Sequence, residues 1–407
     1  MKTLKPPVVY VCDKVLENRL AKKRMDRLMT KIETPEVKII TDQEFDELIR
    51  ENGWSGSRRL SGRQRHGDPP IVLNVYRWLP EDFDRTQPVP REYKNMLSGL
   101  WNHRTRENIL KKDGVVCQSG YGFHSARGCL FKCDYCFFED LLLLELNMEE
   151  FLEHLDPFVR SVEGPTLWKW DNQSDTICFE PEMGATKIFV EYFSQFDNHF
   201  LMLYTKSDNV DFLLDLDHKG QTLVCWTLNA YTQSRMIERD AATMEERIEA
   251  ARKCQEAGYP VRFRLSAVCP VKGWQRENRE MLELLFKNVR PDLISLETLS
   301  RMPSYQMFEN VMDAALFEPR FVEAIKAGRE EMKGKIWGPI PDNEREEIYR
   351  FLINEIHRIS PKTSVSLCQE PAEMWQRLSD VLTVTPDYYV CCCAKDSVPG
   401  HALIPEH

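Results

Sequence analysis

The stretch G-C-L-F-K-C-D-Y-C, residues 128–136, carries the strongest structural signal in this chain of 407 residues. Its cysteines, Cys129, Cys133 and Cys136, follow the spacing C-x3-C-x2-C, which a random chain of this cysteine content matches only about 0.01 times. Three thiolates on one short loop can bind three irons of a cubane [4Fe–4S] cluster, whereas electron-carrier clusters generally use four cysteines. The fourth iron is then open to a small molecule, so the pattern predicts chemistry at the cluster.

A structural zinc site is the alternative for the same cysteines. Structural zinc takes four ligands, usually from two C-x2-C-like knuckles, and no second knuckle lies near residues 129–136. The open iron–sulfur cluster is therefore the favoured interpretation.

Composition indicates a globular protein that is not secreted. The chain is long enough for one large α/β domain with additions, or for two domains. It contains neither an apolar run of membrane-spanning length nor the N-terminal apolar stretch of a signal peptide. Its 13 cysteines favour reduced thiols and metal binding over a disulfide scaffold. We therefore expect a cytoplasmic protein without a membrane partner.

The charge distribution bears on nucleic-acid binding. A net charge of −10 argues against a protein that coats nucleic acid non-specifically. Residues 57–67, S-R-R-L-S-G-R-Q-R-H-G, nevertheless carry four arginines and a histidine. Such a loop can neutralise phosphates or can be a solvated loop without a ligand, and the sequence leaves both interpretations open.

Short apolar runs alternate with helical patterns from residue 120 onward, as in βα units around a parallel sheet. Strands are expected over residues 121–126, 176–180, 200–205, 223–228, 261–268 and 293–296, and helices over residues 139–155 and 243–257. Six such units predict an α/β fold of the partial (β/α)6 TIM barrel type, in which the loops after the strands carry the active site. The cysteine loop follows the first expected strand and therefore belongs to that end of the barrel.

This barrel is expected to cover residues 119–340. Residues 1–118 precede it as an N-terminal region that is a candidate for nucleic-acid contact. Residues 341–407 form a C-terminal segment with an expected helix over 343–359, an expected strand over 364–367 and a cysteine-rich tail.

The cysteine loop resembles the cluster-binding motif of the radical SAM superfamily. In that superfamily S-adenosylmethionine (SAM) chelates the open iron, and one electron from the cluster releases a 5′-deoxyadenosyl radical that abstracts hydrogen from a substrate. The protein positions and shields this chemistry. The resemblance implies that Cys129, Cys133 and Cys136 are the ligands of a [4Fe–4S] cluster, with SAM as cofactor. It also implies an electron donor such as flavodoxin or ferredoxin.

Further segments are similar to the spore photoproduct lyase family, which repairs a methylene-bridged thymine dimer in DNA. These segments are Val8-Val9-Tyr10, Leu20-Ala21-Lys22-Lys23, Phe179-Glu180, Thr205-Lys206, residues 210–214, residues 226–229, residues 247–251, residues 257–260 and Gly273-Trp274. They fall in the order of the family and span most of the chain. The resemblance implies a thymine or modified thymine in DNA, or a thymine-derived nucleotide, as the substrate.

The resemblance also assigns residues to SAM. Glu180, at the end of the expected second strand, is implied to bind the SAM amino group, with a helix cap or a salt bridge as the alternative. Lys206 and Thr227 would offer a cation and a hydroxyl to the SAM carboxylate, and Asn229 would bind the ribose or the carboxylate. For each of these, a polar strand-end residue without a ligand is the alternative.

Two departures from the family put its usual repair route in doubt. The family carries a hydrogen-donating cysteine three residues after Phe-Glu, and Met183 stands at that position here. A thioether has no S–H to donate. In the family, a tyrosine stands on each side of the last cluster cysteine. Here Tyr135 is present before Cys136, but Phe137 stands in place of the second tyrosine. Cys178 is expected to be a buried apolar residue rather than a substitute donor.

Two explanations follow for the missing donor. In the first, a thiol among Cys391, Cys392 and Cys393 folds over the barrel mouth and supplies the hydrogen, with an inert flexible tail as the alternative. In the second, the enzyme is an isomerase of a hypermodified thymidine, and the substrate radical takes its hydrogen back from 5′-deoxyadenosine. A non-catalytic iron–sulfur or zinc protein that binds nucleic acid is the hypothesis from another class.

Trp168 and Trp170 flank Lys169 just before the expected second strand. Aromatic side chains can hold bases that have left the stack, so a stacking platform is one interpretation. Packing in the core or under a lid is favoured for such large apolar side chains.

Overall fold

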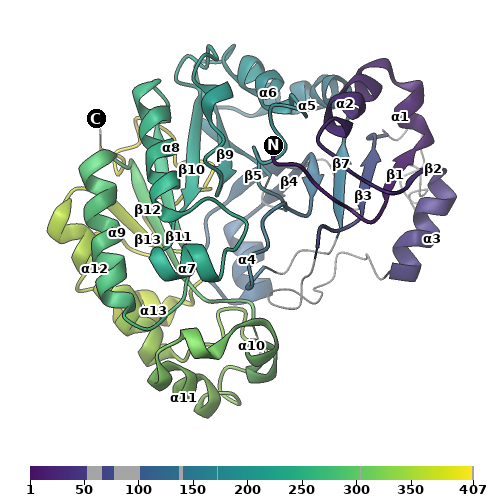
Figure 1. Cartoon of the computed structure of the whole chain (residues 1–407). Helices are drawn as coiled ribbons and strands as arrows, with labels where there is room; N and C mark the ends of the chain where they lie inside the picture. Colours follow the sequence, from purple (N-terminus) through teal and green to yellow (C-terminus); the bar gives the residue numbers. More distant parts are fainter. Residues whose placement is uncertain (53–66, 78–100, 137–140, 172, 303, 406–407) are drawn as a thin grey trace.

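The computed structural model of this chain describes residues 1–52, 67–77, 101–136, 141–171, 173–302 and 304–405 (Figure 1). The arginines of the basic stretch and Phe137 lie outside the described residues. No described helix is both long enough and apolar enough to cross a membrane.

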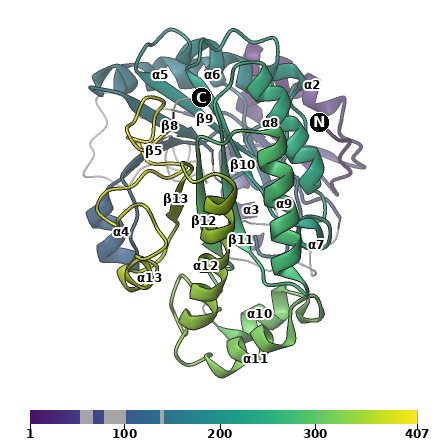
Figure 2. The same cartoon turned by 90° about the vertical axis from the view of Figure 1, so that its left-hand side faces the viewer.

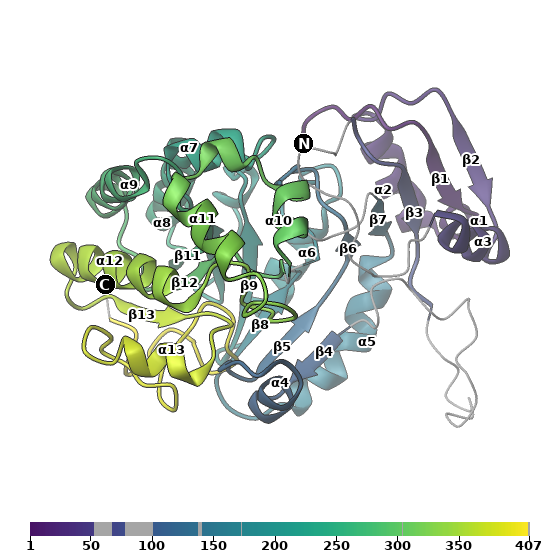
Figure 3. The ribbon, with the colours of Figure 1, turned by 90° about the horizontal axis from the view of Figure 1, so that it is seen from below.

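The larger of two sheets is an open half-barrel of eight strands in the spatial order β13-β12-β11-β10-β9-β8-β5-β4. Every neighbouring pair is parallel except β4 and β5. The strands are β4 (Trp101–Arg104), β5 (Gly120–Phe123), β8 (Thr166–Trp170), β9 (His199–Thr205), β10 (Thr222–Thr227), β11 (Val261–Val268), β12 (Leu293–Thr298) and β13 (Ser364–Leu367). The curl of this sheet, visible in Figure 3, confirms the expected partial TIM barrel.

Helices connect these strands and cover the outer face of the half-barrel. Most of them bury one apolar face, and α8 starts at a capping box in which Thr243 and Glu246 satisfy each other's backbone amides. The helices are α4 (Arg106–Asp113), α5 (Met148–Ser161), α6 (Ala185–Phe193), α7 (Tyr231–Met236), α8 (Met244–Glu256), α9 (Trp274–Asn288), α10 (Tyr305–Val311), α11 (Pro319–Ala327), α12 (Asp342–Ile359) and α13 (Ala372–Arg377). In Figure 1, α10 and α11 lie beyond the carboxyl ends of the strands.

The smaller sheet has five strands in the order β2-β1-β3-β7-β6. Its elements are β1 (Val9–Cys12), β2 (Val37–Ile40), β3 (Ile71–Asn74), β6 (Ala126–Arg127) and β7 (Leu142–Glu145), with α1 (Asp13–Glu17), α2 (Arg19–Met29) and α3 (Asp42–Asn52). The two sheets exchange strands across the expected boundaries, because β4 joins the larger sheet while β6 and β7 join the smaller one. The cysteine loop, between β6 and β7, is therefore anchored in the smaller sheet and faces the larger one.

Most of the expected elements from residue 199 onward are present within two residues of the predicted bounds. Three earlier predictions are wrong in part or in full. The strand expected over residues 121–126 is divided between β5 and β6, which lie in different sheets. Residues 176–180 form a turn, and the second strand of the half-barrel is β8. The helix expected over residues 139–155 contains the strand β7 before α5 begins, because a short, wholly buried apolar run suits a strand as well as a helix.

The β8 strand explains the two tryptophans. Trp168 and Trp170 are 0% and 1% exposed. The Trp168 ring stacks on Tyr121 with centroids 4.8 Å apart, and the Trp170 ring lies 4.6 Å from that of Phe189 in α6. The stacking-platform interpretation is therefore wrong, and core packing is confirmed. Because side chains alternate along a strand, Lys169 faces the interior of the half-barrel.

The C-terminal tail closes the amino end of the half-barrel. Its apolar side chains Val390, Cys392, Val398 and Ile404 form a cluster with Leu167, Phe200, Met202, Leu223, Cys225 and Leu293 of the strands. The Lys395 carbonyl accepts a hydrogen bond of 2.8 Å from the Leu167 amide, at the start of β8. Figure 2 shows the tail, in yellow, running to the end of the sheet remote from α10. The prediction that the tail folds over the barrel mouth is therefore wrong.

Candidate active site

A loop between β6 and β7 carries the three cysteines, and a glycine sets its entry. Gly128 has a φ of 79°, in the left-handed region that favours glycine. A Cβ at this position would lie 1.8 Å from the Leu141 carbonyl oxygen, so no side chain fits there. The Gly128 amide donates to the Gln173 carbonyl at 3.1 Å, and the Cys136 amide donates to the Cys133 carbonyl at 3.0 Å. These contacts give the loop one defined path.

A second set of contacts holds the same loop against the segment before α8. The Asp134 amide donates to the Ile237 carbonyl at 2.9 Å, and the Asp134 carboxylate pairs with Arg239 at 2.9 Å. Cys133 forms an isolated β-bridge with Glu238. The loop is thus fixed from the smaller sheet on one side and from the half-barrel on the other.

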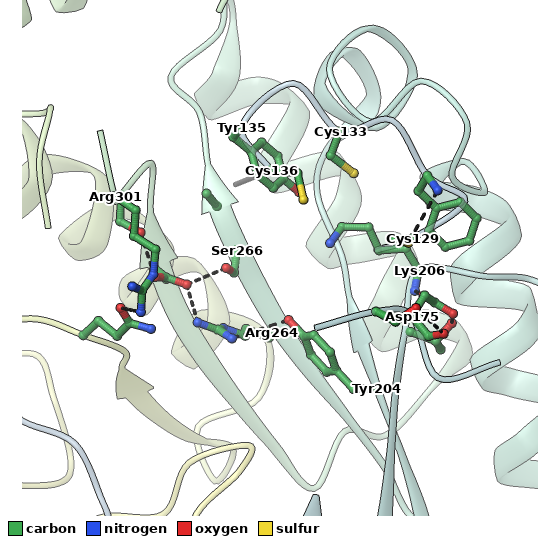
Figure 4. Close-up of a pocket in the computed structure, with 17 residues that line it drawn as sticks. Cys129, Cys133, Tyr135, Cys136, Asp175, Tyr204, Lys206, Arg264, Ser266 and Arg301 are labelled. Carbon is green, nitrogen blue, oxygen red and sulfur yellow. Dashed lines mark hydrogen bonds and ion pairs between the residues drawn. The ribbon is translucent and has the colours of Figure 1, made fainter. Parts of the chain in front are cut away.

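The three cysteines line one cavity of about 190 Å³ at the carboxyl ends of the strands (Figure 4). The opposite wall comes from the ends of several strands and the loops that follow them, and includes Asp175, Tyr204, Lys206, Arg264, Ser266 and Glu297. This is the position that the loops after the strands of a TIM-type barrel give to an active site.

The donor set fits an iron–sulfur cluster. Among the described residues, no group of three His, Cys, Asp or Glu side chains lies close enough to hold a single metal ion, whereas a cubane offers a separate iron to each cysteine. Burial raises the pKa of the Cys133 thiol, and the Lys206 cation opposes this. A hydrogen bond from Cys178 lowers the pKa of Cys129. Because cluster ligands are thiolates, a cation beside the loop favours the ligating form.

Lys206 brings that cation to the cysteine loop. Burial alone would lower the pKa of Lys206, but the negative charges of Cys133 and Glu238 raise it above its ordinary value. Its amine lies 5.7 Å from the centroid of the Tyr135 ring. In Figure 4 the Lys206 side chain extends across the cavity below Cys133 and Cys136. The cavity therefore holds a permanent positive charge next to the three thiols.

Asp175, which sequence analysis missed, lines the same cavity. Its carboxylate accepts hydrogen bonds from the Lys206 amide at 2.6 Å and the Thr205 hydroxyl at 2.9 Å. Burial raises the pKa of Asp175 to about 6. Asp175 was missed because the second strand was predicted over residues 176–180, which placed Asp175 before a strand. Since β8 in fact ends at Trp170, Asp175 lies in the loop that follows a barrel strand, where active-site residues are expected.

Glu180 does not stand at a strand end and is not among the described residues that line this cavity. Its Oε1 accepts hydrogen bonds from the amides of Ala185 and Thr186, each at 2.9 Å, and its Oε2 accepts one from the Gly184 amide at 2.8 Å. The carboxylate thus caps the amino end of α6. The structure corrects the expected contact with the SAM amine to the helix-cap alternative, because both oxygens are already engaged.

Thr227 and Asn229 lie behind the cavity wall. The Thr227 hydroxyl donates to the Tyr204 hydroxyl at 2.7 Å. The Asn229 amide donates to Glu238 at 2.8 Å and to the Ser266 carbonyl at 3.0 Å. Neither is among the described lining residues, so each reaches the cavity only through Tyr204 or Ser266.

Tyr135 lines the cavity and is fixed by a carboxylate that sequence analysis did not single out. Its hydroxyl donates to Glu238, which is fully buried and forms an ion pair of 2.6 Å with Arg247. Burial and the Glu238 charge raise the pKa of Tyr135 well above its ordinary value. The phenol therefore keeps its proton.

The two sulfur-bearing side chains near Phe179, Met183 and Cys178, are both buried. Met183, at the position of the family's cysteine, is held through its carbonyl, which accepts a hydrogen bond of 3.1 Å from Arg27. Cys178 is 4% exposed, as expected, and its sulfur lies 3.4 Å from the Asp175 carbonyl oxygen. Neither is among the described residues that line the cluster cavity.

The tail cysteines lie elsewhere. Cys391, Cys392 and Cys393 line a second cavity of about 60 Å³. Tyr204 and Arg264 line both cavities. In the described part of the chain, the cluster cavity therefore has no lining thiol apart from Cys129, Cys133 and Cys136.

Comparison with known proteins agrees with this geometry. A family model described as spore photoproduct lyase matches residues 104–301. Residues 104–301 of this chain are therefore similar to the spore photoproduct lyase family. The spore photoproduct lyase of Bacillus subtilis is 29% identical over 184 residues, which cover 43% of this chain and 54% of that protein. That of a Geobacillus species is 23% identical over 188 residues, covering 44% and 55%. The matched region thus spans about half the length of these curated relatives.

Solved structures extend the similarity in fold. A mutant spore photoproduct lyase with bound AdoMet and dinucleoside spore photoproduct has a TM-score of 0.59 at 17% identity, over 90% of this chain and 99% of that one. Another mutant of the same enzyme has a TM-score of 0.61 at 17% identity, with the same coverage. At such identity the likeness shows the fold alone. Of the segments similar to the family, Val8-Val9-Tyr10 and Leu20-Ala21-Lys22-Lys23 lie outside the family-model match.

Proposed function

We propose that this chain is a radical SAM enzyme that abstracts hydrogen from a thymine or modified thymine base, in DNA or in a thymine-derived nucleotide. The observation that carries the proposal is the placement of Cys129, Cys133 and Cys136 around one cavity with Lys206 and Asp175. A [4Fe–4S] cluster held by the three cysteines would supply the electron that cleaves SAM to methionine and a 5′-deoxyadenosyl radical. Flavodoxin or ferredoxin is the proposed source of that electron.

Lys206 and Asp175 supply the two charges that the amino-acid part of SAM needs. Its carboxylate suits the Lys206 ammonium, and its amine suits the Asp175 carboxylate, since charge-assisted hydrogen bonds are the strong ones. The Asp175 carboxylate accepts a hydrogen bond from the Lys206 backbone amide, so this contact between the loop after β8 and the end of β9 places the two charges side by side. Asp175 thereby takes the role that the family resemblance gave to Glu180.

The base would enter from the opposite side of the cavity. Arg264, Ser266 and Glu297 form a connected polar wall there, in which Glu297 accepts hydrogen bonds from Arg264 and, at 2.6 Å, from the Ser266 hydroxyl. Such a wall offers both donors and acceptors, which the edge of a thymine-type base requires. Extrusion of a base from a duplex costs a few kcal/mol, so a single-stranded or already distorted substrate is favoured.

A rearrangement without a protein hydrogen donor is the second candidate, and one observation favours it over net repair. The described lining of the cluster cavity includes no thiol besides the iron ligands, and Met183 offers none. In a rearrangement the substrate gives a hydrogen atom to the 5′-deoxyadenosyl radical and, once rearranged, takes one back from the 5′-methyl group. Hydrogen and electrons then balance without a further reductant.

Anaerobic reconstitution tests the proposed function. The protein is loaded with iron and sulfide, reduced with dithionite and given SAM, and 5′-deoxyadenosine is measured. We expect its formation in the wild type and in Cys254→Ala, a buried cysteine outside both cavities, and its loss in Cys129→Ala. A fully loaded wild type that forms none would overturn the proposal and support a non-catalytic binding protein.

Substrate and outcome are tested on DNA that contains spore photoproduct and on DNA with modified thymines. A rearrangement predicts only traces of 5′-deoxyadenosine per product and recovery of substrate deuterium in SAM. Net repair with consumption of SAM predicts stoichiometric 5′-deoxyadenosine and no label in SAM.

A further inference from the structure

A second cavity lies inside the half-barrel, between the cluster cavity and the tail. Its volume of about 60 Å³ is several times the roughly 10–15 Å³ that one water needs. Three cations line it: Arg104 of β4, Lys169 of β8 and Arg264 of β11. Because Tyr204, Arg264 and Gln369 line both cavities, the two adjoin.

Lys169 is the most costly of these cations. Lys169 is only 8% exposed, and the tryptophans on either side of it in the sequence face the other side of the sheet. Its ammonium makes no hydrogen bond with any described residue. An uncompensated buried charge destabilises a fold strongly. A charge kept in such a place is expected where an opposite charge arrives with a ligand.

Each of the two arginines also has a hydrogen-bond donor that is not used within the described residues. The Nε atoms of Arg104 and Arg264 are buried and have no hydrogen-bond partner among the described residues. Another nitrogen of Arg104 donates to the Cys393 sulfur at 2.7 Å, and Arg264 pairs with Glu297. A hydrogen bond from Cys391 and the positive charge of Arg104 hold the pKa of Cys393 well below its ordinary value. Even with Cys393 as a thiolate, three cations face only two anions.

We propose that this second cavity binds an oxyanion of the size of a carboxylate or phosphate, with Lys169 as its main cation and Arg104 and Arg264 beside it. The anion can be an acidic substituent of the substrate that reaches past Tyr204, or a free small anion. The first source rests on the proposed function, whereas the second does not. The shared chemistry, an oxyanion on three cations, is the same in both cases.

The groups around Lys169 also give the proposal a pH signature. Burial, followed by repulsion from Arg104, lowers the pKa of Lys169 to about 8, and Arg264 adds to this while the Cys393 and Cys117 thiols oppose it. A bound anion stabilises the charged lysine. Binding should therefore be strong at pH 7 and weaken as the pH rises above 8.

Calorimetry with inorganic phosphate and with acetate, on the reconstituted full chain at pH 7, tests the site. We compare the wild type with Lys169→Met, which keeps the volume of the side chain, and with Lys187→Met, the same charge change at an exposed position of α6. The expected result is saturable binding near one per chain in the wild type and in Lys187→Met, weakened at least tenfold in Lys169→Met. Equal binding in all three proteins would overturn the proposal.

Two nucleosides distinguish the sources of the anion. 5-Carboxymethyl-2′-deoxyuridine carries a carboxylate where 5-hydroxymethyl-2′-deoxyuridine is neutral. Tighter binding of the acid by tenfold or more, lost in Lys169→Met, assigns the site to a substrate group. If the two nucleosides bind equally and phosphate still binds, the site is assigned to a free anion. If the acidic nucleoside is not preferred and phosphate does not bind, the proposed site is contradicted.

A measurement in the wild type keeps the test independent of how the variant folds. Phosphate in the cavity should slow alkylation of Cys393 by iodoacetamide at least threefold, as followed by mass spectrometry, and should leave alkylation of Cys254 unchanged. An unchanged rate at Cys393 contradicts the site. Failure of the radical enzyme appears separately, as absence of 5′-deoxyadenosine, and does not affect either phosphate assay.

Discussion

At the scale of single residues, two buried carboxylates near the cluster loop have different roles, one in the cavity and one as a helix cap. Asp175 faces the cavity, while Glu180 is engaged by three backbone amides at the start of α6. We expect Asp175→Asn to raise the KM for SAM at least tenfold, because the amide cannot balance the charge of the SAM amine. The measurement is 5′-deoxyadenosine formation as a function of SAM concentration.

Glu180→Gln is the matched control for that prediction. One oxygen that accepts hydrogen bonds becomes an NH2 group facing amide donors, so the free energy of unfolding should fall by about 2 kcal/mol. The KM for SAM should stay within a factor of two. A large rise in KM for Glu180→Gln, with Asp175→Asn unaffected, would restore Glu180 as the SAM ligand.

Lys169 allows a second prediction at this scale, on stability. Its pKa is about 8 in the folded chain against an ordinary 10.5, so below pH 8 it is charged in both states and burial of the charge opposes folding in full. As the pH rises from 8 to 10.5 the folded chain holds the neutral amine, the unfolded chain still binds the proton, and the cost disappears. Lys169→Met should therefore be more stable than the wild type at pH 7, by about 3 kcal/mol.

Urea unfolding of both proteins at pH 7 and at pH 10.5 measures this difference. The difference in free energy of unfolding between the two proteins should shrink toward zero at the higher pH. Because all other titrating groups are the same in both proteins, their contributions cancel in this difference. A gap that stays constant with pH would show that the gain comes from packing rather than from the charge.

At the scale of elements, the cysteine loop depends on the backbone of one glycine. Gly128 and Gly164 both have a φ of 79°, but a Cβ at Gly128 would lie 1.8 Å from a carbonyl oxygen, whereas a Cβ at Gly164 meets nothing within 4 Å. Both substitutions by alanine incur the cost of a left-handed conformation, about 1–2 kcal/mol. Only Gly128→Ala should displace β7 and reduce the bound iron by more than half after reconstitution. Equal iron contents in the two variants would contradict this role of Gly128.

The element scale also shows what could be predicted from the sequence. The spacing of Cys129, Cys133 and Cys136 specified a local loop, and β9 to β13 followed from apolar runs bounded by clear turns. β8 was missed although Trp168, Lys169 and Trp170 alternate in polarity, because a five-residue strand that is buried throughout offers only a short stretch of alternation. With β8 misplaced, Asp175 could not be recognised, and Glu180 appeared at a strand end that does not exist.

At the scale of the whole molecule, the two sheets share the segment around the cysteine loop. β5 lies in the half-barrel, while β6 and β7 lie in the smaller sheet, so the loop is fixed where the two sheets meet. Such pairings join residues distant in sequence, as when β3 pairs with β7. Local patterns carry no information about them, which is why the expected boundaries at residues 118 and 340 do not separate the sheets.

The tail gives the last prediction at this scale. Removing residues 390–407 takes away the buried side chains of Val390, Val398 and Ile404, each contributing about 1.5–3 kcal/mol. It also removes the carbonyls of Cys392 and Ser397, which accept hydrogen bonds of 3.1 and 3.0 Å from the fully buried Arg262. The truncated chain should therefore lose about 5 kcal/mol or more of its free energy of unfolding, measured by urea unfolding.

The control for the truncation is Asp396→Ala, which changes the tail at an exposed position and should alter stability by less than about 0.5 kcal/mol. The prediction separates two views of the tail. A tail that closes the amino end of the half-barrel is needed for folding itself, so its loss should expose the barrel interior to protease before any effect on SAM can be measured. A truncated chain with wild-type stability would show that the half-barrel closes without the tail.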